Sequence, residues 1–197
     1  TNGTYAYGIV NNSIKELTLQ AWYYDMVRLA KAYWLQADVS VDGLLAGVQY
    51  ANTDIDKGAN LGSLGVIGAS KDTSAWSAML GYDIKDVALV KAAYSSVDDD
   101  GVLGMANTAT GSVATLGGQS KLYTEMWWNY GNVSAVGADS YSITAETTVG
   151  PDVAILAGYY FADVNPVGTE SDKEVTEVTV AAFKSFGPLD ASLALIH

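Results

Sequence analysis

Alternation of apolar and less apolar residues with a period of two recurs through most of this chain, and it constrains the fold more than any other feature. Residues 33–41 show it most clearly, because Tyr33, Leu35, Ala37 and Val39 alternate with a more polar set. Successive side chains of a strand point to opposite faces, so the pattern predicts strands with one apolar face. The same alternation marks residues 76–83, 88–95, 122–130, 141–149 and 177–182.

One stretch, residues 18–38, also allows an interpretation as a single amphipathic helix. The helix would carry a mixed stripe of apolar, aromatic and basic residues, whereas two strands over residues 17–24 and 33–41 alternate cleanly. We therefore predict two strands. A single helical turn over residues 25–30 would connect them, with Asp25 as its N-cap.

The composition is unusual for a domain that water surrounds. Charged residues make up 16% of the 197-residue chain, against about 25% in an average soluble domain, while 49% is hydrophobic and the net charge is −12. An acidic chain repels phosphates, which argues against a nucleic-acid partner. Cysteine is absent and His197 is the only histidine, which excludes disulfides and thiolate chemistry and leaves little room for histidine catalysis.

Aromatic residues on the apolar face gather at the predicted strand ends, which favours a transmembrane β-barrel over a soluble sandwich. Outer-membrane barrels carry such aromatic girdles around an aliphatic middle, whereas a sandwich core should hold large rings in mid-strand as often. Tyrosine is also simply a good strand former, which is the alternative explanation. The predicted girdle residues are Tyr23, Tyr33, Tyr50, Trp76, Tyr82, Tyr94, Trp128, Tyr130, Tyr141 and Tyr160.

The connections support an all-β, antiparallel barrel over residues 1–197 as a single domain. No apolar run reaches the roughly 18 residues of a membrane helix. Strict alternation fails between residues 122 and 153, so either one strand predicted there is wrong or one outer loop is very short. We count about 11 strands, with short turns on one side and long loops on the other, as in barrels. Short turns are predicted at 42–43, 84–86, 150–152 and 187–190, and long loops at 53–73, 97–120 and 164–173.

Four strings, "LTLQAWYYD", "AKAYWLQAD", "GLLAGVQYA" and "KLYTEMWWNYG", resemble the major outer membrane porins of epsilonproteobacteria, which are related to the OprD-type porins. The resemblance is densest over residues 17–51 and 121–131. It implies a homotrimer in the bacterial outer membrane, with about 16–18 strands in a chain about twice this length. This chain would then be a fragment that lacks the N-terminal part and the closing strand. A pore-narrowing loop usually comes from the early strands, so the resemblance places that loop outside this chain.

The less apolar face predicts the function, which is passive diffusion of ions and small hydrophilic solutes. Acidic groups outnumber basic ones on this face, so we predict a preference for cations. Some of these side chains could instead pair with one another across strands. The predicted pore-lining residues are Gln20, Gln36, Asp38, Gln49, Lys91, Glu125, Asn129, Glu146 and Glu177.

Two acidic loop stretches raise the question of calcium. Clustered carboxylates beside a glycine turn can gather oxygen ligands around Ca²⁺, but neither stretch matches a full calcium-loop signature. A solvated acidic loop is the alternative, and such loops could also bridge to neighbouring lipopolysaccharide through divalent ions. Lipid and lipopolysaccharide are therefore the expected surroundings. The speculative calcium ligands are Asp54, Asp56, Asp98, Asp99 and Asp100.

A secreted, soluble β-sandwich that binds or hydrolyses polysaccharide is the alternative function. Glu125 and Glu146 could form the carboxylate pair of a glycosidase, with Trp127 and Trp128 stacking on sugar. Carboxylates on adjacent strands are common, however, and the chain has neither a GxSxG motif nor a phosphate-binding loop. We therefore predict that the protein is not an enzyme and uses no cofactor apart from the speculative calcium.

Overall fold

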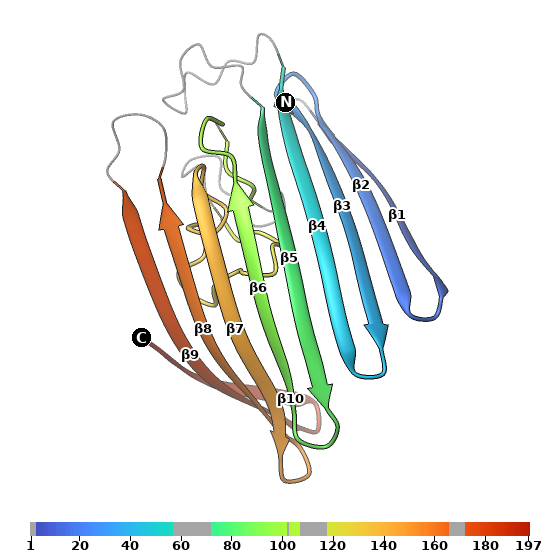
Figure 1. The fold of residues 1–197 in the computed structure, drawn as a ribbon, viewed down its shortest axis with the longest axis vertical. Helices are drawn as coiled ribbons and strands as arrows, with labels where there is room; N and C mark the ends of the chain where they lie inside the picture. The colour runs from blue at the N-terminus through green and yellow to red at the C-terminus, as the bar shows by residue number, and fades with distance from the viewer. Residues whose placement is uncertain (1–2, 57–71, 102, 107–117, 166–171) are drawn as a thin grey trace.

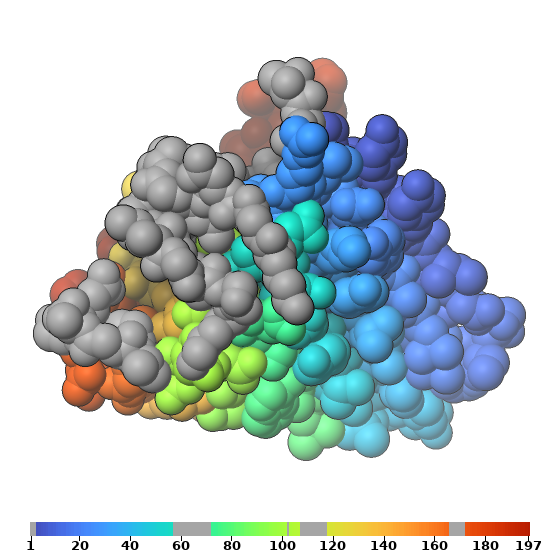
Figure 2. Space-filling model, turned by 90° about the horizontal axis from the view of Figure 1, so that it is seen from above, coloured from blue at the N-terminus to red at the C-terminus, as the bar shows by residue number. Residues whose placement is uncertain are grey.

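The computed structural model describes residues 3–56, 72–101, 103–106, 118–165 and 172–197. These residues form one antiparallel sheet in which ten strands follow one another in chain order (Figure 1). The predicted all-β antiparallel architecture is thus confirmed. Seen from above, the strands follow a curve from the blue N-terminal to the red C-terminal end (Figure 2). The strands are β1 (Thr4–Ile14), β2 (Leu17–Met26), β3 (Ala30–Val41), β4 (Leu44–Ile55), β5 (Thr73–Ile84), β6 (Ala88–Val97), β7 (Ala138–Val149), β8 (Val153–Val164), β9 (Lys173–Phe186) and β10 (Leu189–Ile196).

The turns after β1, β3, β5, β7 and β9 lie at one end of the sheet, and the long connections after β4, β6 and β8 lie at the other, together with the short reversal between β2 and β3 (Figure 1). The β3–β4 hairpin needs only two turn residues. Asp42 and Gly43 have φ values of 48° and 85°, and two successive left-handed residues give a tight turn whose twist matches that of the strands. The predicted helical turn is wrong, because Asp25 lies in β2, directly opposite Lys31 of β3. The reversal instead uses three residues, with Arg28 at a φ of 65°.

The strand predicted at residues 122–130 is wrong. Strand β6 pairs directly with β7, so the sheet offers no neighbour to a strand between them, and residues 118–137 are irregular. Leu122, Thr124 and Met126 are nevertheless buried at every second position, which explains the misleading alternation. The described residues therefore form ten strands rather than about 11, and the first of the two alternatives for residues 122–153 is correct.

One face of the sheet, here called the outer face, is apolar and open to the surroundings. Leu80 is 60% exposed, and Val48 and Ile143 are similarly exposed at the middle of their strands. Among the described residues neither a second sheet nor a helix covers this face, and no described helix is long and apolar enough to cross a membrane. A sandwich would bury this surface against another sheet, so this packing does not support the sandwich alternative.

Aromatic rings form a belt on the outer face, near the end that carries the long connections. Neighbouring rings touch across strands, with centroid distances of 5.2 Å for Tyr23–Tyr33, 5.2 Å for Trp76–Tyr94 and 5.0 Å for Tyr141–Phe161. Such pairs favour one another beyond their burial. Six predicted girdle residues lie in this belt: Tyr23, Tyr33, Tyr50, Trp76, Tyr94 and Tyr141. A seventh, Tyr82, lies on the same face but near the short turns.

Three girdle predictions are wrong. Tyr160 faces the opposite side of the sheet and is only 4% exposed, because its neighbour Tyr159 takes the outward position opposite Ile143. Residues 153–162 are apolar on both faces, so their alternation gave no sign of the register. Trp128 and Tyr130 lie in the irregular residues 118–137 and belong to no strand.

Candidate functional site

The second face of the sheet, here called the inner face, carries a polar row across six strands. The register aligns one residue from each of β2 to β7, so that each side chain lies directly opposite the next. Alternation places all of them on the side away from the apolar outer face. The row consists of Gln20, Gln36, Gln49, Ser77, Ser95 and Ser140.

Residues 118–137, here called the inner segment, pack against this inner face. Leu122, Met126 and Val133 are buried in one apolar cluster with small wall residues such as Ala51 and Ala75. Alanine leaves room on the wall for the larger side chains of the segment. The connection between β6 and β7 is therefore packed against the concave side of the sheet, and it is not a loop that only projects into solvent.

The side chain of Gln49 on β4 anchors the start of the inner segment. Its amide nitrogen donates to the Lys121 carbonyl at 3.0 Å, and its amide oxygen accepts from the Tyr123 N–H at 3.1 Å. The Tyr123 hydroxyl donates to the Asp38 carboxylate on β3. Gly47 faces that hydroxyl, and a Cβ there would collide with it. The side-chain amide of Gln49 thus pairs with backbone groups of residues 121–123 as a neighbouring strand would.

Glu177 on β9 anchors the middle of the inner segment. Its carboxylate accepts the backbone N–H groups of Trp127 at 2.8 Å, Trp128 at 3.0 Å and Asn129 at 2.8 Å. It also accepts the Asn129 side-chain amide at 3.1 Å and the Thr179 hydroxyl at 2.9 Å. The residue is 0% exposed. A buried carboxylate is costly unless it is hydrogen-bonded, and here five donors surround it.

Two ionisable groups of the inner segment have shifted pKa values. Burial raises the pKa of the Glu125 carboxyl, although the Ser120 hydroxyl and N–H donate to it. Burial, together with the hydrogen bond to Asp38, raises the pKa of the Tyr123 phenol. Tyr123 therefore stays a neutral donor to Asp38 at ordinary pH, which keeps this contact intact.

The predicted pore-lining residues divide into two groups. Seven are strand residues whose side chains lie on the inner face: Gln20, Gln36, Asp38, Gln49, Lys91, Glu146 and Glu177. Glu125 and Asn129, by contrast, lie in the inner segment, so their predicted strand register is wrong.

Several of these polar residues bind one another or the inner segment. Lys91 and Glu146 form an ion pair of 2.5 Å across β6 and β7, while Gln49 and Glu177 hold the inner segment. Glu125 and Glu146 thus have partners in Ser120 and Lys91. Whether the inner-face residues line a conducting pore stays a prediction.

Other residues of this face escaped the sequence analysis. Trp22 and Trp34 lie directly opposite each other on β2 and β3, on the inner face. Period-two alternation had already grouped each with the polar side of its strand, which was the available signal. Alternation also grouped Tyr123 with the less apolar set of residues 122–130, but as part of a strand that the structure does not contain, and Lys121 lay outside that pattern.

The calcium interpretation gains no support from the described residues. Among them, no group of three or more acidic or histidine side chains is placed to hold a metal ion. Asp98 is bound by the Ser74 N–H at 2.9 Å and by the Ser74 hydroxyl at 2.6 Å. Asp54 lies in β4 and faces Lys31 on β3. Most of the loop after Asp56 lies outside the described residues.

Comparisons with solved structures identify the architecture. The chain superposes on Pseudomonas aeruginosa OccK5 (OpdH) with a TM-score of 0.74 at 12% identity, covering 98% of this chain and 52% of that one. Acinetobacter baumannii OccAB1 gives a TM-score of 0.74 at 14% identity, with 98% and 50% covered. Pseudomonas aeruginosa OprD gives 0.69 at 12% identity, with 98% and 55% covered. The fold is that of the OprD-like porins.

This chain spans about half the length of the OprD-like chains that it matches. No protein-family model and no curated protein sequence matches it, so the relation to the epsilonproteobacterial porins stays a resemblance. That resemblance placed the pore-narrowing loop of the early strands outside this chain, which stays a prediction, and the structure adds that a connection within this chain, the inner segment, packs on the inner face.

Proposed function

We propose that this chain forms part of the wall of an outer-membrane porin, a passive diffusion channel for ions and small hydrophilic solutes. The observation that carries the proposal is the two-faced sheet: an apolar, aromatic-belted outer face and a polar inner face that bears a folded-in connection. Lipid and lipopolysaccharide would surround the outer face, as around the barrels that such girdles mark.

Solutes would cross by diffusion along their own gradients, without an energy source. The inner segment occupies part of the concave side, so the free cross-section of the lumen would be smallest beside it. Its position depends on side chains from the neighbouring strands β3 and β4 and from β9, which lies far from them in the sheet. A connection tied at several points keeps a constant pore size, which suits a channel that is permanently open.

We further propose that the channel prefers cations. A narrow lumen lined with one sign of charge concentrates the opposite ion. The described inner face and inner segment present more acidic than basic side chains, and they still do when the ion pair of Lys91 and Glu146 is left out. The acidic residues are Asp38, Asp83, Glu125, Glu146, Glu177 and Asp190, and the basic ones are Lys91, Lys121 and Lys173.

Planar-bilayer recording of the intact, full-length protein tests this function. We propose that the protein forms a homotrimer with three equal pores, so we expect ohmic currents that close in three equal steps. We also expect a reversal potential in a KCl gradient whose sign indicates a preference for cations. Anion selectivity would contradict the charge argument, and the absence of any conductance from folded, membrane-inserted protein would contradict the porin proposal itself.

A further inference from the structure

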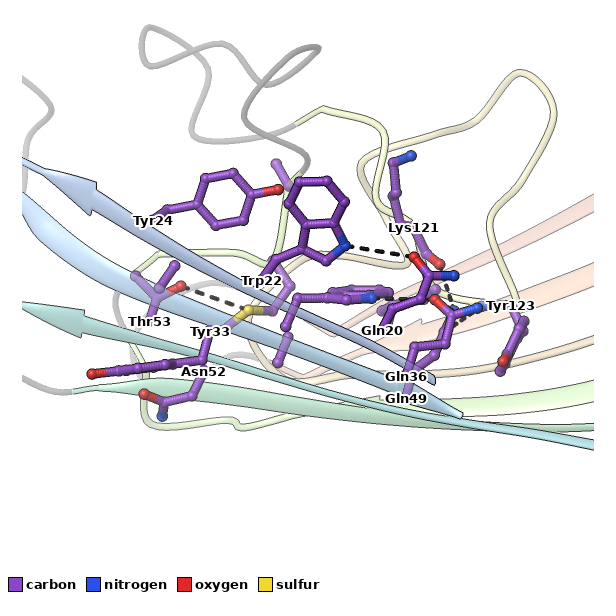
Figure 3. A pocket seen from close by; sticks show the side chains of 16 residues that line it. Gln20, Trp22, Tyr24, Tyr33, Gln36, Gln49, Asn52, Thr53, Lys121 and Tyr123 are labelled. Carbon is purple, nitrogen blue, oxygen red and sulfur yellow. Dashed lines mark hydrogen bonds between the residues drawn. The ribbon is translucent and has the colours of Figure 1, made fainter. Parts of the chain in front are cut away.

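A cavity of about 640 Å³ lies between the inner face of β2 to β4 and the inner segment (Figure 3). Its volume falls within the roughly 300–1,000 Å³ of small-molecule sites. Gln20, Trp22 and Tyr24 extend from β2 toward the inner segment, and Lys121 belongs to that segment, whereas the side chain of Tyr33 points to the outer face (Figure 3).

The cavity contains an aromatic ring, the indole of Trp22, whose position is fixed by its neighbours. Gly8 of β1 lies directly opposite Trp22, and a Cβ at Gly8 would collide with the six-membered ring of that indole. One face of the ring therefore packs against the bare backbone of β1. The indole nitrogen donates to the Gln20 amide oxygen at 3.5 Å, and the neighbouring Trp34 is tied to Gln36 at 3.2 Å in the same way. These contacts hold the rings in place before any solute arrives.

Unused hydrogen-bonding groups surround this aromatic surface. Within the described part of the chain, the Gln20 amide nitrogen, the Tyr24 hydroxyl and the Lys121 ammonium have no hydrogen-bond or ion-pair partner. Gln36 and Gln49, in contrast, are occupied by Trp34, Asp38 and the inner segment. The lining includes one charged side chain, Lys121, and no carboxylate.

We propose that this cavity binds a neutral pyranose sugar. A pyranose ring has an apolar face that can stack on an indole and a rim of hydroxyl oxygens that can accept from Gln20 and Tyr24. An inorganic ion would make no use of the indole, and a purely aromatic solute would leave the polar groups unpaired, which costs binding energy. A sugar acid would need basic partners for its carboxylate, and the described lining offers a single one, Lys121. The inference rests on the proposed function, because solutes would reach the cavity through the lumen.

Maltose binding to the intact protein in detergent micelles, measured by calorimetry, tests the proposal. We expect weak, millimolar binding, as befits a site that must release its solute. Mannitol, which has hydroxyl groups but no ring face, should bind at least about tenfold more weakly than maltose. Trp22→Ala should weaken maltose binding about tenfold, while Trp76→Ala on the outer face should leave it unchanged.

Gln20→Ala is the second variant, because it keeps the Trp22 ring but removes the free amide nitrogen and the acceptor of the indole N–H, and we expect about fivefold weaker binding. The proposal is overturned if maltose does not bind, if mannitol binds equally well, if Trp22→Ala and Gln20→Ala both retain full affinity, or if galacturonate binds more tightly than maltose. Normal conductance without maltose binding would contradict this inference alone, whereas maltose binding without conductance would contradict the porin proposal.

Discussion

Replacing Glu177 by Ala is expected to release the inner segment from β9 and to destabilise the protein by about 3–5 kcal/mol, because several buried donors lose their shared acceptor at about 1–3 kcal/mol each. Three backbone N–H groups of residues 127–129 lose their acceptor in this variant, and buried donors without partners are unfavourable. In bilayers the single-channel current of the full-length variant should be larger and noisier, because the segment no longer holds one position.

The matched control is Glu174→Ala, which makes the same change of charge on the same strand. Glu174 lies opposite Asp163, on the outer face of β9, away from the inner segment. It should leave the unfolding midpoint in urea and the current noise close to those of the parent protein. Equal effects of the two substitutions would show that the carboxylate of Glu177 does not anchor the segment.

Replacing Leu80 by Arg is expected to oppose insertion into lipid by about 2–4 kcal/mol, the cost of a cation near the bilayer midplane. Leu80 is 60% exposed on the outer face of β5. It lies between two aromatic residues of the same face and strand, Trp76 and Tyr82. Folding of the full-length protein into lipid vesicles, titrated with urea, measures this cost as a shift of the midpoint.

Met79→Arg provides the comparison, since it places the same charge one residue earlier in β5 and therefore on the inner face. Water in the lumen would solvate that arginine, so we expect a cost under about 1 kcal/mol. A Leu80→Arg penalty no larger than that of Met79→Arg would mean that the outer face does not meet lipid, and the membrane proposal would have to be abandoned.

Prediction from sequence worked where neighbouring residues alone decide the outcome. Alternation in residues 33–41 depends only on the two-residue period of a strand, so both the strand and its inner positions Gln36 and Asp38 were predicted correctly. The Asp42-Gly43 turn is equally local, because few residue pairs adopt two successive left-handed conformations.

Prediction failed where alternation had two explanations. In residues 122–130 the buried side chains do alternate, but they alternate against a wall that belongs to other strands. A strand requires a neighbour to accept its hydrogen bonds, and nothing in these residues says whether one exists. In residues 153–162, both faces are apolar, so the inward position of Tyr160 could not be read from the pattern.

The sequence alone therefore determined that this chain is built from strands with one apolar and one polar face, because that property is encoded in every second residue. Only the tertiary structure decided that residues 118–137 pack on the inner face, since their anchors come from distant strands. Gln49 and Glu177 lie more than 40 residues along the chain from the inner-segment groups that they bind. Contacts of that separation form only when the sheet curls and brings its concave side around the segment.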